Sequence, residues 1–127
     1  MRFAYLHVHL SCFLLYFSVT VHNTLCKDVP RVLPLPIRLY LANGLTGIVE
    51  CPVDANPPVT RVTWAINERL IDIRRLSHMR IGADGSLVIA RVERKDEGRY
   101  SCTAYSSLGS GQMSTPVQVL VRGCCRI

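Results

Sequence analysis

The stretch that decides the fold is Leu87-Val88-Ile89-Ala90-Arg91-Val92-Glu93-Arg94-Lys95-Asp96-Glu97-Gly98-Arg99-Tyr100-Ser101-Cys102. At its start and at its end, apolar residues recur at every second position. Leu87 and Ile89 therefore share one face of a short strand, and Tyr100 and Cys102 share one face of another. The charged residues between the two runs predict an exposed connection.

The same period-two alternation recurs throughout residues 27–122, and no apolar pattern of helical period persists there. Turn signals such as Asn43-Gly44 and Asp84-Gly85 separate the runs. Many short strands with frequent turns predict an all-β sandwich or barrel. Leu33-Pro34-Leu35-Pro36 suits an edge strand, because proline cannot donate to a central ladder. The other runs are Val49 and Cys51; Val62, Trp64 and Ile66; Ala104 after Cys102; and Val117, Val119 and Val121.

Trp64 lies 13 residues after Cys51, and Tyr100 lies two residues before Cys102. With the opening stretch, this spacing resembles the intermediate set of the immunoglobulin superfamily. The resemblance implies a Greek-key β-sandwich with one inter-sheet disulfide between Cys51 and Cys102. That bond would close a 52-residue loop and contribute about 3–4 kcal/mol. The resemblance also implies a core signature: Trp64 against the disulfide, and Leu87 in the strand that precedes the corner. Asp96 would lie in that corner, Gly98 would provide the conformational freedom for its tight turn, and Tyr100 would hydrogen-bond to its backbone.

The same resemblance implies a partly buried ion pair between Arg80 and Asp96 at the bottom of the sandwich. The alternative is that both charges are exposed and contribute about 0–1 kcal/mol.

A closer resemblance covers about residues 33–121. It is carried by Gly47-Ile48-Val49-Glu50-Cys51-Pro52-Val53-Asp54-Ala55-Asn56-Pro57-Pro58, by Val62-Thr63-Trp64, by Gly85-Ser86-Leu87-Val88-Ile89-Ala90 and by residues 100–109. These segments are similar to one immunoglobulin domain of the Turtle family. The resemblance implies a role in cell recognition, in axon and dendrite patterning and in synapse organisation. Turtle proteins also carry further immunoglobulin domains, fibronectin domains and a membrane span. In this chain we expect one immunoglobulin domain and no span after residue 26, as in a fragment or truncated product or in a short secreted relative.

The ends of the chain differ from its middle. Residues 1–26 have a basic start and an apolar run, which predicts a signal peptide cleaved after Cys26 or after Thr20; the alternative is a membrane anchor. Residues 27–31 are expected to form a linker and residues 32–122 the immunoglobulin-like domain. A short cysteine-containing tail, residues 123–127, would follow. Its Cys124 and Cys125 could form intermolecular disulfides. The alternative is that the tail results from a message truncated or spliced just past the domain. The domain is thus expected outside the cell, either secreted or at the surface as a fragment of a type I membrane protein.

Catalysis finds little support in the residues. Outside residues 1–26 the only histidine is His78, and no motif provides it with a nucleophile or an orienting group. We expect His78 to be an exposed loop residue. No paired metal-ligand motif and no glycine-rich phosphate loop occurs. The sequence therefore predicts a binding protein without catalytic residues, metal or cofactor.

Three surfaces are candidates for binding. Tyr105 and Leu108 belong to a predicted hairpin, and Leu70 and Ile71 to a predicted sheet edge; the alternative is an ordinary turn and ordinary strand packing. The third surface is basic. Arg69, Arg74, Arg75 and Arg80 precede the predicted strand at Leu87, and Arg91, Arg94, Lys95 and Arg99 follow it. The whole chain has a net charge of +6, with 15 Lys and Arg against 9 Asp and Glu. These cations could attract heparan sulfate, or simply form a solvated face. We expect a protein partner, homophilic or a related immunoglobulin-superfamily protein. We expect no nucleic acid, because no aromatic residues are interleaved with the basic ones.

Overall fold

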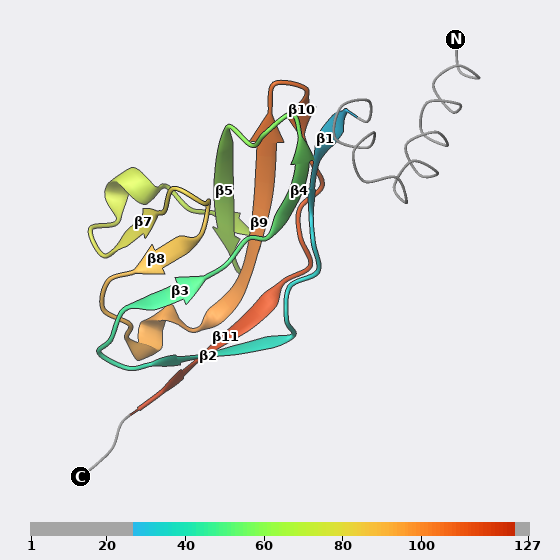
Figure 1. Cartoon of the computed structure of the whole chain (residues 1–127). Helices are drawn as coiled ribbons and strands as arrows, with labels where there is room; N and C mark the ends of the chain where they lie inside the picture. Colours follow the sequence, from blue (N-terminus) through green and yellow to red (C-terminus); the bar gives the residue numbers. More distant parts are fainter. Residues whose placement is uncertain (1–26, 124–127) are drawn as a thin grey trace.

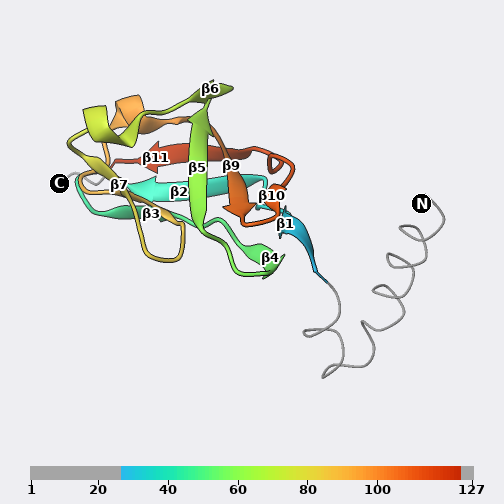
Figure 2. The same cartoon turned by 90° about the horizontal axis from the view of Figure 1, so that it is seen from above.

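The computed structural model describes residues 27–123, which form a six-stranded and a three-stranded β-sheet packed face to face, with a separate two-stranded pair (Figures 1 and 2). Within this range the only helical elements are two 3-10 turns, η1 (Ile73–Arg75) and η2 (Arg94–Asp96). The expected all-β immunoglobulin-like sandwich is confirmed. The predicted signal peptide and the pair Cys124 and Cys125 lie outside the described residues.

The larger sheet has six strands in the order β2-β11-β9-β5-β6, with β10 pairing β9. Its pairs are antiparallel except for β2 and β11, which run parallel. The strands are β2 (Arg38–Ala42), β5 (Arg61–Ile66), β6 (Arg69–Leu70), β9 (Gly98–Ser106), β10 (Gly109–Ser110) and β11 (Val117–Arg122).

The smaller sheet has three antiparallel strands in the order β3-β8-β7, namely β3 (Gly47–Val49), β8 (Leu87–Ile89) and β7 (Met79–Ile81). A separate antiparallel pair joins β1 (Asp28–Val32) to β4 (Val53–Asn56). Figure 2 shows β3 and β4 on one side of the molecule and β6 and β11 on the other.

The core lies between the sheets and consists of the alternating apolar residues. The Cys51–Cys102 disulfide is confirmed and joins Cα atoms 6.2 Å apart. Trp64 is fully buried, and its Nε1–H donates to the Gly85 carbonyl oxygen at 2.9 Å. The other buried core side chains include Val49, Val62, Leu87, Ile89, Val92, Tyr100, Ala104, Val117, Val119 and Val121.

The beginning of the domain differs from expectation. Residues 28–31, expected in a linker, belong to strand β1, which pairs with β4. Residues 33–36, expected as an edge strand, instead connect β1 to β2. The prolines at 34 and 36 interrupt the ladder at this point, because proline lacks a backbone N–H. The domain therefore starts earlier, and its edge strand precedes the proline run.

Gly111 fixes the position of β1. A Cβ atom at residue 111 would lie 1.9 Å from the carbonyl oxygen of Pro30, and Pro30 itself is fully buried. No side chain larger than hydrogen fits between these two backbones. Gly98, in contrast, was expected to provide conformational freedom, but it is not among the glycines with positive φ; a Cβ there would approach Asn67 and Ile66 at 3.2 Å. Space, rather than an unusual φ, explains glycine at position 98.

Replacing Gly111 with Ala is expected to lower the free energy of unfolding by about 1–3 kcal/mol, because the added methyl group must push Pro30 and β1 away. Urea unfolding measures this change, and the amide of Leu33, which donates to Pro52, should lose hydrogen-exchange protection. Gly123→Ala is the control, since the nearest atom to its Cβ is an Arg94 nitrogen 3.8 Å away. Equal stability of Gly111→Ala and the parent chain would contradict this account of β1.

Candidate protein-binding surfaces

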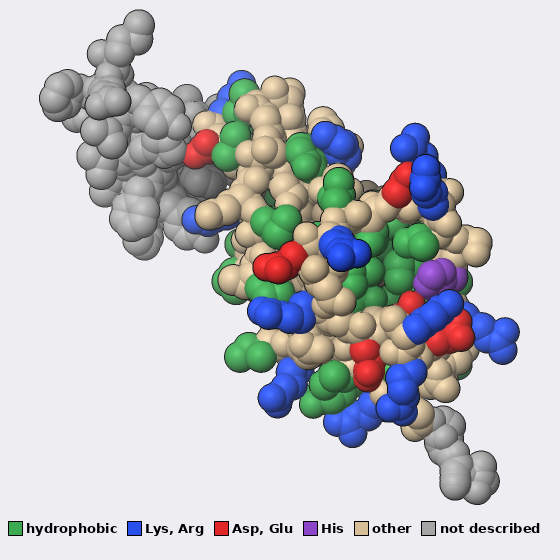
Figure 3. Space-filling view, turned by 180° about the vertical axis from the view of Figure 1, so that it is seen from behind, with side chains coloured by type: hydrophobic (Ala, Val, Ile, Leu, Met, Phe, Trp, Pro, Cys, Tyr) green, Lys and Arg blue, Asp and Glu red, His purple; other side chains and the backbone are tan. Residues whose placement is uncertain are grey.

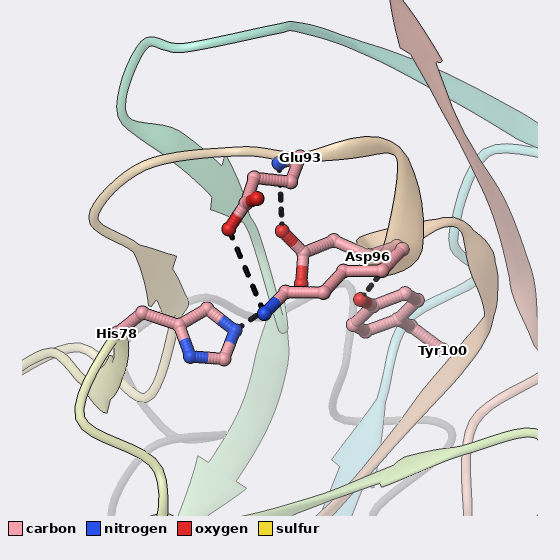
Figure 4. A network of polar contacts seen from close by, with 5 residues as sticks. His78, Glu93, Asp96 and Tyr100 are labelled. Carbon is pink, nitrogen blue, oxygen red and sulfur yellow. Dashed lines mark hydrogen bonds and ion pairs between the residues drawn. The ribbon is translucent and has the colours of Figure 1, made fainter.

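A cluster of polar contacts surrounds Asp96 at the end of η2 (Figure 4). The Asp96 side chain is buried, and its Oδ2 accepts the Glu93 backbone N–H at 2.8 Å. His78 Nε2 lies 3.2 Å from Asp96 Oδ1, and the Tyr100 hydroxyl donates to the Asp96 carbonyl oxygen. Burial, with the nearby Asp96 charge, raises the pKa of Tyr100. The cluster secures the corner between η2 and β9.

The predicted ion pair between Arg80 and Asp96 is wrong, because His78 occupies that place. Arg80 is exposed and lies opposite Val88 in the ladder of β7 and β8. The carbonyl oxygen of His78, two residues before Arg80, accepts the backbone N–H of Ala90, two residues after Val88. The register therefore brings the imidazole, and not the guanidinium, to Asp96. His78 is accordingly a partly buried structural residue rather than an exposed loop residue.

The two residues predicted on the β9–β10 hairpin, Tyr105 and Leu108, lie in different environments. Leu108 lies in the turn with 51% of its surface exposed, and its backbone N–H donates to Ser106 Oγ. Tyr105 lies on the outer face of the sheet and is half-buried. The guanidinium carbon of Arg61 sits 4.0 Å from the centroid of its ring. Leu108 is thus the exposed tip, while Tyr105 belongs to the sheet face.

The second predicted pair, Leu70 and Ile71, also differs in exposure. Leu70 pairs with Ala65 at the edge of the six-stranded sheet and is 70% exposed. Ile71 is half-buried and packs against the core. Of this pair, Leu70 is therefore the residue that a partner can reach.

The outer face of the six-stranded sheet also carries Arg38, Tyr40 and Arg122, which the sequence did not indicate. Tyr40 is 47% exposed, and the guanidinium carbon of Arg122 lies 4.0 Å from its ring centroid. Arg38, Gln118 and Arg99 form one row across β2, β11 and β9. These contacts arise from the parallel pairing of β2 with β11, which joins segments almost 80 residues apart.

Figure 3 views the domain from the side of this sheet and shows Lys and Arg side chains interspersed with hydrophobic ones and with some Asp and Glu side chains. The strands of the sheet contain five arginines and no Asp or Glu. Arg74 and Arg75 in η1 are different, because both guanidinium groups approach the Asp72 carboxylate, at 3.2 and 3.6 Å. The arginines of this sheet therefore have no carboxylate side chain on the same strands.

Other kinds of site find no support in the described part of the chain. Across residues 27–123, no group of three or more His, Cys, Asp or Glu side chains is arranged to hold a metal ion. No helix in that range is long and apolar enough to cross a membrane.

Comparison with known proteins places these features in context. The family model of the immunoglobulin I-set domain matches residues 30–119. Mouse Protein turtle homolog A is 37% identical over 92 residues, which cover 72% of this chain and 8% of that protein. The chain therefore spans less than a tenth of the length of this relative.

Solved structures share the fold at lower identity. The tandem immunoglobulin repeats of Dlar match with a TM-score of 0.65 and 23% identity, over 78% of this chain and 51% of that one. The insect immune protein hemolin matches with a TM-score of 0.64 and 21% identity, over 74% of this chain and 24% of hemolin. Hemolin's domain arrangement has been described as having implications for homophilic adhesion.

The Asp96 cluster yields a stability test. His78→Ala is expected to lower the free energy of unfolding by about 1–2 kcal/mol, because the buried carboxylate loses a partner. Arg80→Ala is expected to change it by less than about 0.5 kcal/mol, as for most exposed side chains. Chemical denaturation of the two variants measures both values. A larger loss for Arg80→Ala than for His78→Ala would restore the pair expected from the sequence.

Proposed function

Because this chain belongs to the immunoglobulin I-set family, we propose that it acts outside the cell as a recognition module in cell–cell adhesion. It binds a protein partner and catalyses no reaction. Similarity to Protein turtle homolog A supports a role in neuronal patterning, at axons, dendrites or synapses. The partner is a second copy of the chain or a related immunoglobulin-superfamily protein.

The observation that carries this proposal is the set of exposed aromatic, aliphatic and arginine side chains on the six-stranded sheet and its hairpin. Tyr and Arg are enriched at protein interfaces and among the residues that dominate binding energy. Leu108 at the hairpin tip and Leu70 at the sheet edge add exposed apolar side chains to the same sheet. A rigid sandwich presents such residues with little loss of conformational entropy.

The alternative is a secreted ligand or decoy that binds a receptor or heparan sulfate. A polyanionic glycan would favour a continuous cluster of free cations. The two basic pairs, Arg74 with Arg75 in η1 and Arg94 with Lys95 in η2, lie in turns that are well separated in Figure 1, with η1 above η2. Arg74 and Arg75 already share Asp72, and Lys95 approaches Glu93 at 3.6 Å. These two pairs therefore form no continuous cluster. The arginines of the six-stranded sheet lie among exposed tyrosine and leucine side chains, which favours a protein partner.

A cell-aggregation assay tests the proposal. The full chain, fused to a membrane anchor on otherwise non-adherent cells, is expected to cluster these cells with one another or with cells that carry a related immunoglobulin-superfamily protein. Leu108→Ser should slow clustering at least twofold by removing an exposed apolar contact at the hairpin.

Ile48→Ser is the matched control, because Ile48 is also 51% exposed but lies on the smaller sheet. Cells that never cluster, with analytical ultracentrifugation showing only monomer, would refute the adhesion function. Equal slowing by both variants would refute the role of the hairpin.

A further inference from the structure

We propose that the outer face of the six-stranded sheet binds a protein surface rich in Asp and Glu side chains, and that it does not pair with the same face of a second copy. This inference rests on the proposed function and specifies its partner. We call the surface formed by Arg38, Tyr40, Arg61, Arg99, Tyr105 and Arg122 the arginine face.

The charges of the arginine face are not balanced from within the sheet. Neither Arg38 nor Arg99 forms an ion pair within residues 27–123, and Gln118 stands between them in the same row. Their backbones are two strand spacings apart, about 10 Å. Two acidic residues directly precede strands of this sheet. Glu97 precedes β9, and its Oε2 accepts the Val121 N–H at 2.8 Å; Glu68 precedes β6 in the β5–β6 turn. The face thus retains an excess of positive charge.

Two of the arginines are held in place by aromatic rings. Arg61 lies over Tyr105, and Arg122 lies over Tyr40, each with its guanidinium carbon 4.0 Å from the ring centroid. A stacked guanidinium keeps its N–H edge available for a carboxylate, which it can bind with two parallel hydrogen bonds. Because stacking already restricts the side chain, less entropy is lost on binding. The arrangement is therefore suited to planar carboxylate groups.

Apolar surface between the cations favours a protein over a sulfated glycan. Tyr40 is 47% exposed, Leu120 lies beside it in the ladder of β2 and β11, and Leu70 marks the far edge of the sheet. Burying such side chains needs an apolar complement, which a protein interface provides at its centre. A sulfated glycan offers charge but no such complement.

A second copy does not fit this face. A two-fold symmetric contact places each surface against itself, so the arginines of one copy would meet those of the other. Like charges brought together across an interface cost several kcal/mol. The arginine face therefore requires a different surface opposite it, even where the whole molecule binds its own kind.

The test measures binding of the full chain to two defined probes, a random Glu–Tyr copolymer and heparin. The face variant is Arg38→Gln with Arg99→Gln, and the matched control is Arg80→Gln with Arg91→Gln, which removes the same charge from exposed residues outside this sheet. We expect the face variant to weaken copolymer binding at least tenfold and the control less than threefold. We expect heparin binding to weaken equally in both variants. Thermal unfolding verifies that both variants remain folded.

Three results of the binding test would overturn the inference. They are no binding of the copolymer by the parent chain, an equal loss of copolymer binding in the face variant and the control, or a face variant that loses heparin binding but not copolymer binding. Self-association of the parent chain in sedimentation, abolished by the face variant, would show that the occupant is a second copy and would overturn it too. The aggregation assay separates the two proposals. Absence of clustering by the parent chain refutes the adhesion function, whereas failure of the copolymer test in a chain that clusters refutes this inference alone.

Discussion

The rest of the structure depends on the covalent tie between two sheets across a thin apolar layer. Cys51 precedes β4 on one side of the core, and Cys102 lies in β9 on the other, so their bond fixes the spacing of the layers. Trp64 fills the volume beside it and is held by the Gly85 carbonyl. With Cys51, Cys102 and Trp64 inside, most strands alternate between the core and the outer face. Ala65 in β5 and Val88 in β8 are exceptions, because each is buried beside a core residue.

This constraint explains why the outer face can carry function. Residues on the outside of β2, β5, β9 and β11 contribute little to the core, so their chemistry is free to serve recognition. Five arginines and no acidic residue occupy the strands of that sheet, a distribution that packing alone does not require. The strands of the smaller sheet also lack acidic residues, but they carry only one arginine, Arg80 in β7.

Much of the architecture could be predicted from short-range patterns. The alternation around Trp64 and Tyr100 and the positions of Cys51 and Cys102 were sufficient for the fold and the disulfide. A prediction that needed register failed: a difference of two residues along β7 and β8 decides whether Arg80 or His78 reaches Asp96. The stack of Arg122 on Tyr40 could not be foreseen, because it depends on a parallel pairing of distant segments. The strand β1 was missed for a similar reason, since its position depends on contact with Gly111.

The disulfide has one further consequence, for proteolysis. The loop that it closes includes η1, where the side chains of Arg74 and Arg75 are 91% and 88% exposed. A trypsin-like cut after either residue would divide the polypeptide into two fragments that remain one covalent molecule. Because β5 and β9 lie on opposite sides of such a cut and pair along six residues, the fragments would also stay joined through the sheet. Backbone cleavage at this point would be visible only after reduction.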